Sequence, residues 1–360
     1  MSLSYVFTDD FIDELNYTFN YTSIDQTFYI DPKTLSCETT PLEPKVALIL
    51  CFILIAIFFL AIPGNLLVGL VIGTSRQPLT PSDVYLFHLT IADGLMALSL
   101  PFSAVALVQG WIFGDFLCKF FSLIIEANFY TSIIFLACIS IDRYLAIVHA
   151  GESIRNHQKT CSRILCAAIW AFGGALSLPA LFNETYKFDK DSDRLVCSES
   201  FDFGSASSWR LATRFFRHFF GFLLPLCIML TCYSITIARL LRTRGFQKHR
   251  AMKVIIAVVI AFVLCWTPYH ITMIVDTILR ADLVQFNCAM RKSVNVASVA
   301  TNSLALLHSC INPVLYAFVG EKFRKKMLLL FQRKLRQERV SGTRFSRSTS
   351  QTSDANGAVL

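Results

Sequence analysis

The chain contains seven stretches that are long and apolar enough to cross a lipid bilayer. Five of them have no Asp, Glu, Lys or Arg, and the other two have one acid each, Asp93 and Glu126. A helix needs roughly 20 residues to cross the ~30 Å hydrocarbon core, where only helices and closed barrels satisfy their backbone hydrogen bonds. The stretches lack the alternation of barrel strands. The sequence therefore predicts an all-α fold, a seven-transmembrane helix bundle with spans at residues 46–75, 84–114, 120–141, 164–183, 219–238, 254–275 and 293–320.

Charge is distributed unevenly over the remaining segments. Residues 1–44 carry eight acids and one lysine, whereas residues 239–253 carry six basic residues and no acid, and the tail after Gly320 carries ten basic residues and three acids. Loops rich in Lys and Arg stay in the cytoplasm, so we predict an extracellular N-terminus and a cytoplasmic C-terminus. Three glycosylation sequons begin in predicted extracellular segments, at Asn16, Asn20 and Asn183.

Twelve cysteines divide between the two sides of the membrane in the same way. Eight lie within spans or near the inner face, where free thiols are expected. The other four lie in predicted extracellular segments, where disulfides form: Cys37, Cys118, Cys197 and Cys288. Four cysteines allow three pairings, and the residues alone do not choose between them.

Several polar side chains lie inside the spans, where they are costly and usually functional. On the third and seventh spans they recur at helical spacing, so they share one helix face. A single carboxylate among neutral oxygens suits a small hard cation, and the sequence predicts an allosteric sodium site at Asp93, Asn128, Ser132, His308, Ser309 and Asn312. The alternative is a protonated Asp93 that only holds helices together.

Five prolines that each lie inside an apolar stretch are Pro101, Pro179, Pro225, Pro268 and Pro313. Each removes a backbone hydrogen bond and tends to kink its helix. The kinks are either hinges of a bundle that switches between two shapes or static features that shape a cavity. The chain has no phosphate loop, zinc-protease motif or serine elbow, so we predict no enzyme. A transporter or channel is the alternative, although no internal repeat is visible.

Each span also carries a short motif at a defined place. The motifs are Gly64-Asn65, Leu89-x-x-Ala92-Asp93, Asp142-Arg143-Tyr144, Trp170, Pro225 with Tyr233, Cys265-Trp266-Thr267-Pro268 and Asn312-Pro313-x-x-Tyr316. In this order they resemble the rhodopsin-like G-protein-coupled receptor family. The resemblance implies a receptor that switches a partner G protein through Asp142, Arg143, Tyr144, Tyr233, Trp266, Pro268, Asn312, Pro313 and Tyr316. No acid at residues 239–253 is available to lock Arg143, so we expect Arg143 to pair with Asp142 at rest.

Longer matches indicate one branch of that family. They include Asp142 to Ala150, Trp111-Ile112-Phe113-Gly114, Asn128-Phe129-Tyr130, Lys248-His249-Arg250-Ala251-Met252 and His308-Ser309-Cys310-Ile311-Asn312-Pro313. These segments are similar to chemokine receptors, and most of all to CXC chemokine receptors of the interleukin-8-receptor branch. Two departures concern the pocket: Ser103 stands where relatives often place Trp, and Asn302 stands where they often place Glu. The ligand should therefore not be copied from the nearest relatives.

The resemblance implies the disulfides Cys118–Cys197 and Cys37–Cys288 and a basic CXC chemokine as ligand. An acidic tail would steer such a partner, and nearby tyrosines are candidates for sulfation; a merely solubilising tail is the alternative. The ligand-binding residues implied are Asp9, Asp10, Asp13, Glu14, Tyr17, Tyr21, Asp202, Arg210, Arg214, Asp276 and Arg280. An inhibitory heterotrimeric G protein and leukocyte chemotaxis follow as expectations, and a scavenging receptor is the nearest rival.

Four regions follow from these patterns. Residues 1–44 form the tail, 45–319 the membrane domain, 320–332 a short amphipathic cytoplasmic helix facing membrane lipid, and 333–360 a disordered cytoplasmic tail. Receptor kinases and arrestins are the expected partners of the last region, and a homo- or heterodimer is an open alternative. The expected phosphorylation sites are Ser346, Ser348, Thr349, Ser350, Thr352 and Ser353. No cofactor is expected besides the sodium ion, and no nucleic acid is expected as a partner.

Overall fold

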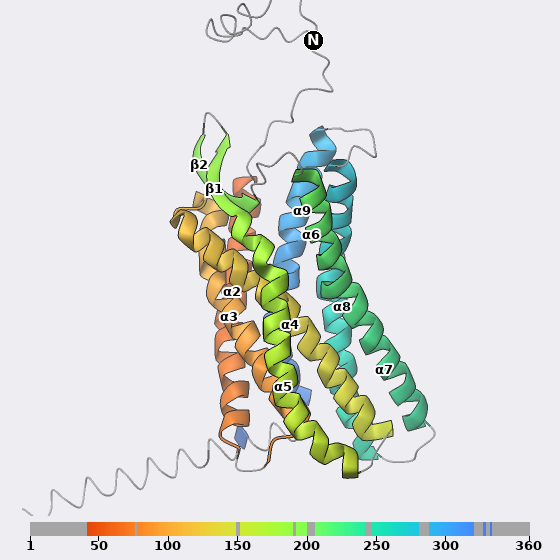
Figure 1. The fold of residues 1–360 in the computed structure, drawn as a ribbon. Helices are drawn as coiled ribbons and strands as arrows, with labels where there is room; N and C mark the ends of the chain where they lie inside the picture. The colour runs from red at the N-terminus through yellow and green to blue at the C-terminus, as the bar shows by residue number, and fades with distance from the viewer. Residues whose placement is uncertain are drawn as a thin grey trace, which may run out of the picture. The chain divides into compact units, whose positions relative to one another are not determined.

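The computed structural model describes residues 42–75, 78–148, 152–189, 192–199, 206–241, 246–280 and 288–319, together with Met327, Leu328 and Gln332. Seven of its helical segments are long and apolar enough to cross a membrane, which confirms the predicted spans. The elements are α2 (Pro44–Gly73), α3 (Pro81–Gln109), α4 (Gly114–Val148), α5 (Glu152–Ser177), η1 (Leu178–Phe182), β1 (Asn183–Asp189), β2 (Ser192–Glu199), α6 (Ala206–His218), η2 (Phe219–Leu223), α7 (Leu224–Leu241), α8 (Phe246–Arg280), α9 (Cys288–Leu306) and α10 (His308–Val319). Figure 1 shows the helices running alongside one another, with the β1–β2 hairpin at one end.

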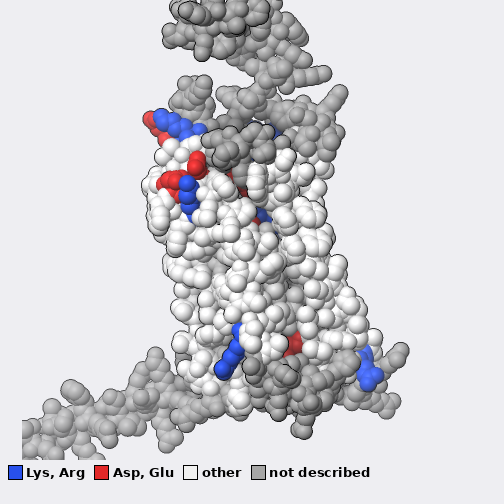
Figure 2. Space-filling model, viewed as in Figure 1, with Lys and Arg blue, Asp and Glu red and all other residues white. Residues whose placement is uncertain are grey.

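The outer faces of the helices are apolar. Phe52, Leu66 and Ile164 are among many large hydrophobic side chains that are more than half exposed. On the face drawn in Figure 2, the charged residues gather near the two ends and leave an uncharged surface between them. A surface of this kind is satisfied by lipid and would be an aggregation hazard in water.

The core is built around α4, which contacts α3, α5 and α7. Its Tyr130, Ile133 and Phe135 are buried together with Leu89 of α3 and Phe262 of α8. The start of α3 is set locally, because Thr80 and Asp83 cap it reciprocally and Pro81 occupies the first turn. Packing around α4 therefore positions the second, fourth and fifth spans relative to the third.

Two spans are irregular in ways the apolar pattern did not predict. The fifth consists of α6, the π-helical turn η2 and α7, and the seventh is broken at Leu307 between α9 and α10. Pro101, Pro268 and Pro313 lie inside helices as expected, but Pro179 lies in η1 and Pro225 is the second residue of α7, just after η2. Pro63 is also inside a helix, and a side chain on the neighbouring Gly64 would approach Pro313 to 2.9 Å. A glycine is needed where α2 and α10 come this close.

The hairpin is fastened to the bundle at several points. The Cys118–Cys197 disulfide joins α4 to β2, as the resemblance implied. Thr185 N–H donates to Asp115 Oδ1 at 3.1 Å, and Trp111 N–H donates to Leu195 O at 2.7 Å. Cys288 is disulfide-bonded, but Cys37 lies outside the described residues, so their pairing stays a prediction.

At the other end of the chain only part of the predicted amphipathic helix is described. Met327, Leu328 and Gln332 are helical, which is consistent with a short helix at 320–332. Other predicted residues lie wholly outside the described part of the chain: Asp9, Asp10, Asp13, Glu14, Asn16, Tyr17, Asn20, Tyr21, Asp202, Ser346, Ser348, Thr349, Ser350, Thr352 and Ser353. For Tyr316 and Arg280 only the helical backbone is described.

Candidate ligand-binding cavity

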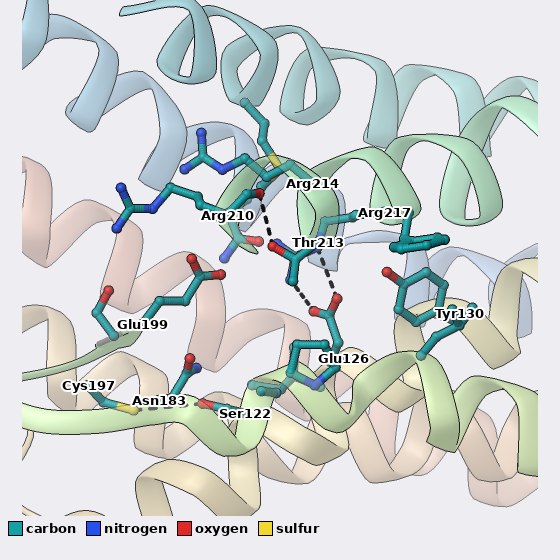
Figure 3. Close-up of a pocket in the computed structure, with 18 of the residues that line it drawn as sticks. Ser122, Glu126, Tyr130, Asn183, Cys197, Glu199, Arg210, Thr213, Arg214 and Arg217 are labelled. Carbon is teal, nitrogen blue, oxygen red and sulfur yellow. Dashed lines mark hydrogen bonds and ion pairs between the residues drawn. The ribbon is translucent and has the colours of Figure 1, made fainter. Parts of the chain in front are cut away.

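A cavity of about 710 Å³ lies at the hairpin end of the bundle. Side chains of α4, α5, η1, both strands, α6, α8 and α9 line it. Figure 3 shows one wall, where residues of α6 face Glu126 and Tyr130. This volume is within the range of sites that enclose a drug-sized ligand or a few peptide residues. The hairpin, held by its disulfide, forms part of the wall rather than an independent flap.

Three arginines of α6 supply most of the positive charge in this cavity. Arg210, Arg214 and Arg217 all line it, and their spacing of four and three residues places them on one helix face. The acids that line it are Glu126 of α4 and Glu199 of β2. The cavity therefore has arginines on one helix and a carboxylate on each of two other elements.

Arg214 and Asp276, both predicted ligand-binding residues, are paired with each other. Arg214 Nη2 donates to Asp276 Oδ2 at 2.7 Å, and its Nη1 donates to the Thr277 hydroxyl at 2.7 Å. The two side chains are only 14% and 10% exposed. This pair joins α6 to α8 at the cavity wall, so a ligand reaching either residue meets an existing ion pair.

A second ion pair, between Arg217 and Glu126, was not predicted. Arg217 donates through Nε to Glu126 Oε1 at 3.0 Å and through Nη2 to Oε2, and its Nη1 donates to the Tyr269 hydroxyl at 2.8 Å. Sequence analysis began the fifth span at Phe219 and so left Arg217 outside it. The signal that would have found the pair is Glu126 itself, the one charge in the third apolar stretch.

Asn183 and the two pocket departures also lie at cavities. Asn183 lines the large cavity, and its Oδ1 is buried with no hydrogen-bond partner among the described residues. Ser103 and Asn302 line a smaller cavity of about 90 Å³ between α2, α3, α4 and α9, and Asn302 lines both cavities. None of the residues that line the smaller cavity is charged.

The predicted polar cluster forms deeper in the bundle. Asp93 is fully buried, its Oδ1 accepts from the Ser132 hydroxyl at 3.0 Å, and its Oδ2 accepts from Asn312 Nδ2 at 2.9 Å. Asn312 Nδ2 also lies 3.2 Å from His308 Nε2. Asn128 is buried nearby on α4 with both amide atoms unpartnered within the described structure. The Ser309 hydroxyl donates instead to Leu306 O of its own helix at 2.8 Å.

The predicted Asp142–Arg143 pair is not formed among the described residues. Asp142 accepts a hydrogen bond from the Ser82 hydroxyl of α3, and no ion pair with Arg143 occurs there. Tyr144 follows on the same helix, and Tyr233 is hydrogen-bonded to Ser140 at 2.5 Å. Asp142 thus ties α4 to α3 rather than to its own neighbour.

Trp266 lies between the cavity and the polar cluster. The centroid of its ring lies 4.7 Å from that of Phe129 and 6.1 Å, edge-on, from that of His308.

A comparison with known families identifies the chain. Residues 64–316 match the model of the family described as 7 transmembrane receptor (rhodopsin family). The chain belongs to this receptor family. It is accordingly a receptor and not an enzyme, and a multi-pass protein of the plasma membrane.

Three relatives show which receptors this one is most usefully compared with. The C-X-C chemokine receptor type 1 of Homo sapiens is 43% identical over 88% of this chain and 87% of its own length. The type 1 receptor of Oryctolagus cuniculus is 45% identical over 76% of each chain. The C-X-C chemokine receptor type 2 of Homo sapiens is 43% identical over 86% of this receptor and 84% of its own length. The predicted resemblance is thereby confirmed.

Proposed function

We propose that this receptor binds CXC chemokines outside the cell and activates inhibitory heterotrimeric G proteins inside it. The observation that carries the proposal is the 43% identity to a C-X-C chemokine receptor over 88% of the chain. The cavity agrees with a protein ligand, because its mouth is bordered by a hairpin and its walls carry charges of both signs. The expected cellular response is leukocyte chemotaxis.

Binding would proceed in two stages. The acidic segment at residues 1–44, placed outside the cell by the charge pattern, would attract the basic chemokine and raise its rate of association. Sulfation of Tyr17 or Tyr21 would add to this attraction. The ligand's own N-terminal segment would then enter the cavity, where it meets Arg210, Glu199 and Arg214, the last of which is paired with Asp276.

Signalling would pass from the cavity through Trp266 and the Pro268 kink of α8 to the cytoplasmic face. There Arg143, which does not pair with Asp142 among the described residues, would contact the G protein. Receptor kinases would then phosphorylate the C-terminal tail, and arrestin binding would end the signal.

The buried cluster around Asp93 fits a sodium ion. It offers one carboxylate, the Ser132 hydroxyl and the amide oxygen of Asn128, which is buried without a partner among the described residues. Sodium is coordinated by oxygen atoms of this kind, and the ion would offset the charge of a fully buried carboxylate. We propose that sodium binds here and favours one arrangement of the helices over another.

The proposal is tested by expressing the receptor in cells and applying a panel of CXC chemokines. Suppression of cyclic AMP is measured with and without pertussis toxin, which inactivates inhibitory G proteins. A response that the toxin abolishes supports both the ligand class and the coupling. Binding and internalisation without that response would instead identify a scavenging receptor, and no binding to surface-expressed receptor would refute the ligand class.

A further inference from the structure

One side chain at the floor of the cavity bonds two other spans at once. Arg217 of α6 uses its Nε and Nη2 groups on the two oxygens of Glu126 in α4, and its Nη1 on the hydroxyl of Tyr269 in α8. The Arg217 and Glu126 side chains are 21% and 15% exposed. All three guanidinium nitrogens are therefore occupied within the protein. These three residues, Glu126, Arg217 and Tyr269, are called the latch below.

The latch is the layer between the cavity and Trp266. All three of its residues line the cavity, and the Tyr269 ring packs edge-on against Trp266 with centroids 5.8 Å apart. Pro268, the proline inside α8, is the residue before Tyr269. A shift of Arg217 caused from the cavity side would thus reach α8 next to its proline, where the helix lacks one backbone hydrogen bond.

The next residue on each helix repeats the contact between α6 and α8. His218 Nδ1 lies 2.8 Å from His270 Nδ1, so two consecutive residues of α6 bond two consecutive residues of α8. Directly after His218, α6 passes into the π-helical turn η2. Turns of this type widen a helix and occur often at functional sites. The local geometry of the fifth span is therefore adjusted at the place where it is fastened to the sixth.

We propose that Arg217 is a positioning residue that couples occupancy of the cavity to the position of α8, and that it is not itself a ligand contact. An anionic ligand group would have to displace Glu126 from two charge-assisted hydrogen bonds, whereas a ligand that pushes Glu126 or α6 moves Tyr269 through bonds already made. For the agonist response this inference rests on the proposed function. The latch itself does not depend on it.

The first experiment needs no ligand. The thermal unfolding midpoint of purified receptor is measured for Glu126→Gln, Arg217→Gln, the double variant, and the charge swap Glu126→Arg with Arg217→Glu. Each single change should lower the midpoint by roughly 5 °C or more, because it strands a largely buried charge. The double variant should be no worse than either single one, and the swap should recover much of the loss. Additive losses would overturn the latch.

Lys119→Gln is the matched control for this series. It removes the cation of two pairs, one with Asp115 on the same helix and one with Glu184 of β1, and the three side chains are 33%, 47% and 51% exposed. An exposed ion pair contributes little, so its midpoint should stay close to that of the wild type. A shift as large as that of Arg217→Gln would show that loss of any charge on these spans has the same effect, and would refute a specific role.

The second experiment measures coupling. At matched surface density, Arg217→Gln and Tyr269→Phe should lower the maximal chemokine response about five-fold with ligand affinity nearly unchanged, and the charge swap should restore the response. Lost affinity with a full response at saturation, not rescued by the swap, would make Arg217 a ligand contact. If the wild type binds no chemokine, the proposed function fails separately. The latch is then tested by basal nucleotide exchange on a purified G protein, which should change in both Arg217→Gln and Tyr269→Phe. An unchanged rate of exchange would overturn the coupling.

Discussion

Replacing Gly221 with alanine is expected to displace the aromatic ring beneath the cavity. A Cβ at this position of η2 would lie 2.3 and 2.4 Å from Phe129 Cε1 and Cζ. Carbon atoms pack at about 3.5–4.0 Å, so the ring must move by more than about 1 Å. It has little room, because Phe129 is 5% exposed and its centroid is 4.7 Å from that of Trp266 and 5.0 Å from that of Tyr130.

The cost follows from these contacts. Overpacking a rigid core typically costs about 1–3 kcal/mol, while replacing glycine by alanine within a helix gains up to about 1 kcal/mol. Gly174→Ala is the matched control, since a Cβ there would meet nothing within 4 Å. The difference between the two variants therefore isolates the clash, and corresponds to an unfolding midpoint roughly 2–6 °C lower for Gly221→Ala.

The assay is thermal unfolding of the two purified variants in the same detergent, followed by basal G-protein activation in membranes. Gly174→Ala should unfold at or above the wild-type midpoint, and Gly221→Ala clearly below it. Because the displaced ring presses on Trp266, only Gly221→Ala should also change basal activation. Equal midpoints would refute the packing argument, and equal basal activation with a lowered midpoint would show that the Phe129–Trp266 contact does not carry the signal.

Three further outcomes are expected. Glycosidase treatment should shift the gel mobility of the wild type and of Asn183→Gln equally, because Asn183 lines the cavity. Asn16→Gln and Asn20→Gln should each reduce the shift, and a glycan found on Asn183 would contradict its placement in the cavity. Asp93→Asn should remove the dependence of agonist affinity on sodium chloride relative to choline chloride, and an unchanged dependence would place the ion elsewhere. Cys118→Ser should release β2 from α4, with the loss of a typical disulfide stabilisation of about 2–4 kcal/mol. Receptor that still reaches the surface, as antibody staining measures, should then no longer bind chemokine. Retained high-affinity binding would show that the hairpin needs no tether.

The spans and the deep polar cluster were predictable, but much of the cavity was not. Asp93, Ser132 and Asn312 were grouped correctly because each is a costly polar residue in an apolar stretch at helical spacing. Arg214 and Asp276 were both assigned to the ligand, and no pattern in the sequence showed that they pair with each other across α6 and α8. The expected Asp142–Arg143 pair is not formed among the described residues, where Asp142 accepts a hydrogen bond from Ser82 of α3 instead.

The sequence alone determined the seven spans and the family, since the transfer of a helix into lipid depends on its own 20 or so residues and the motifs are short. Which charges meet depends on how the helices pack in three dimensions. Glu126 and Arg217 are 91 residues apart, and their pairing depends on the packing of three helices and on the π-helical turn that adjusts one of them. The composition of each span sets the free energy of its transfer into lipid. An ion pair between spans depends instead on the distance between two helices, which the residues of neither helix specify alone.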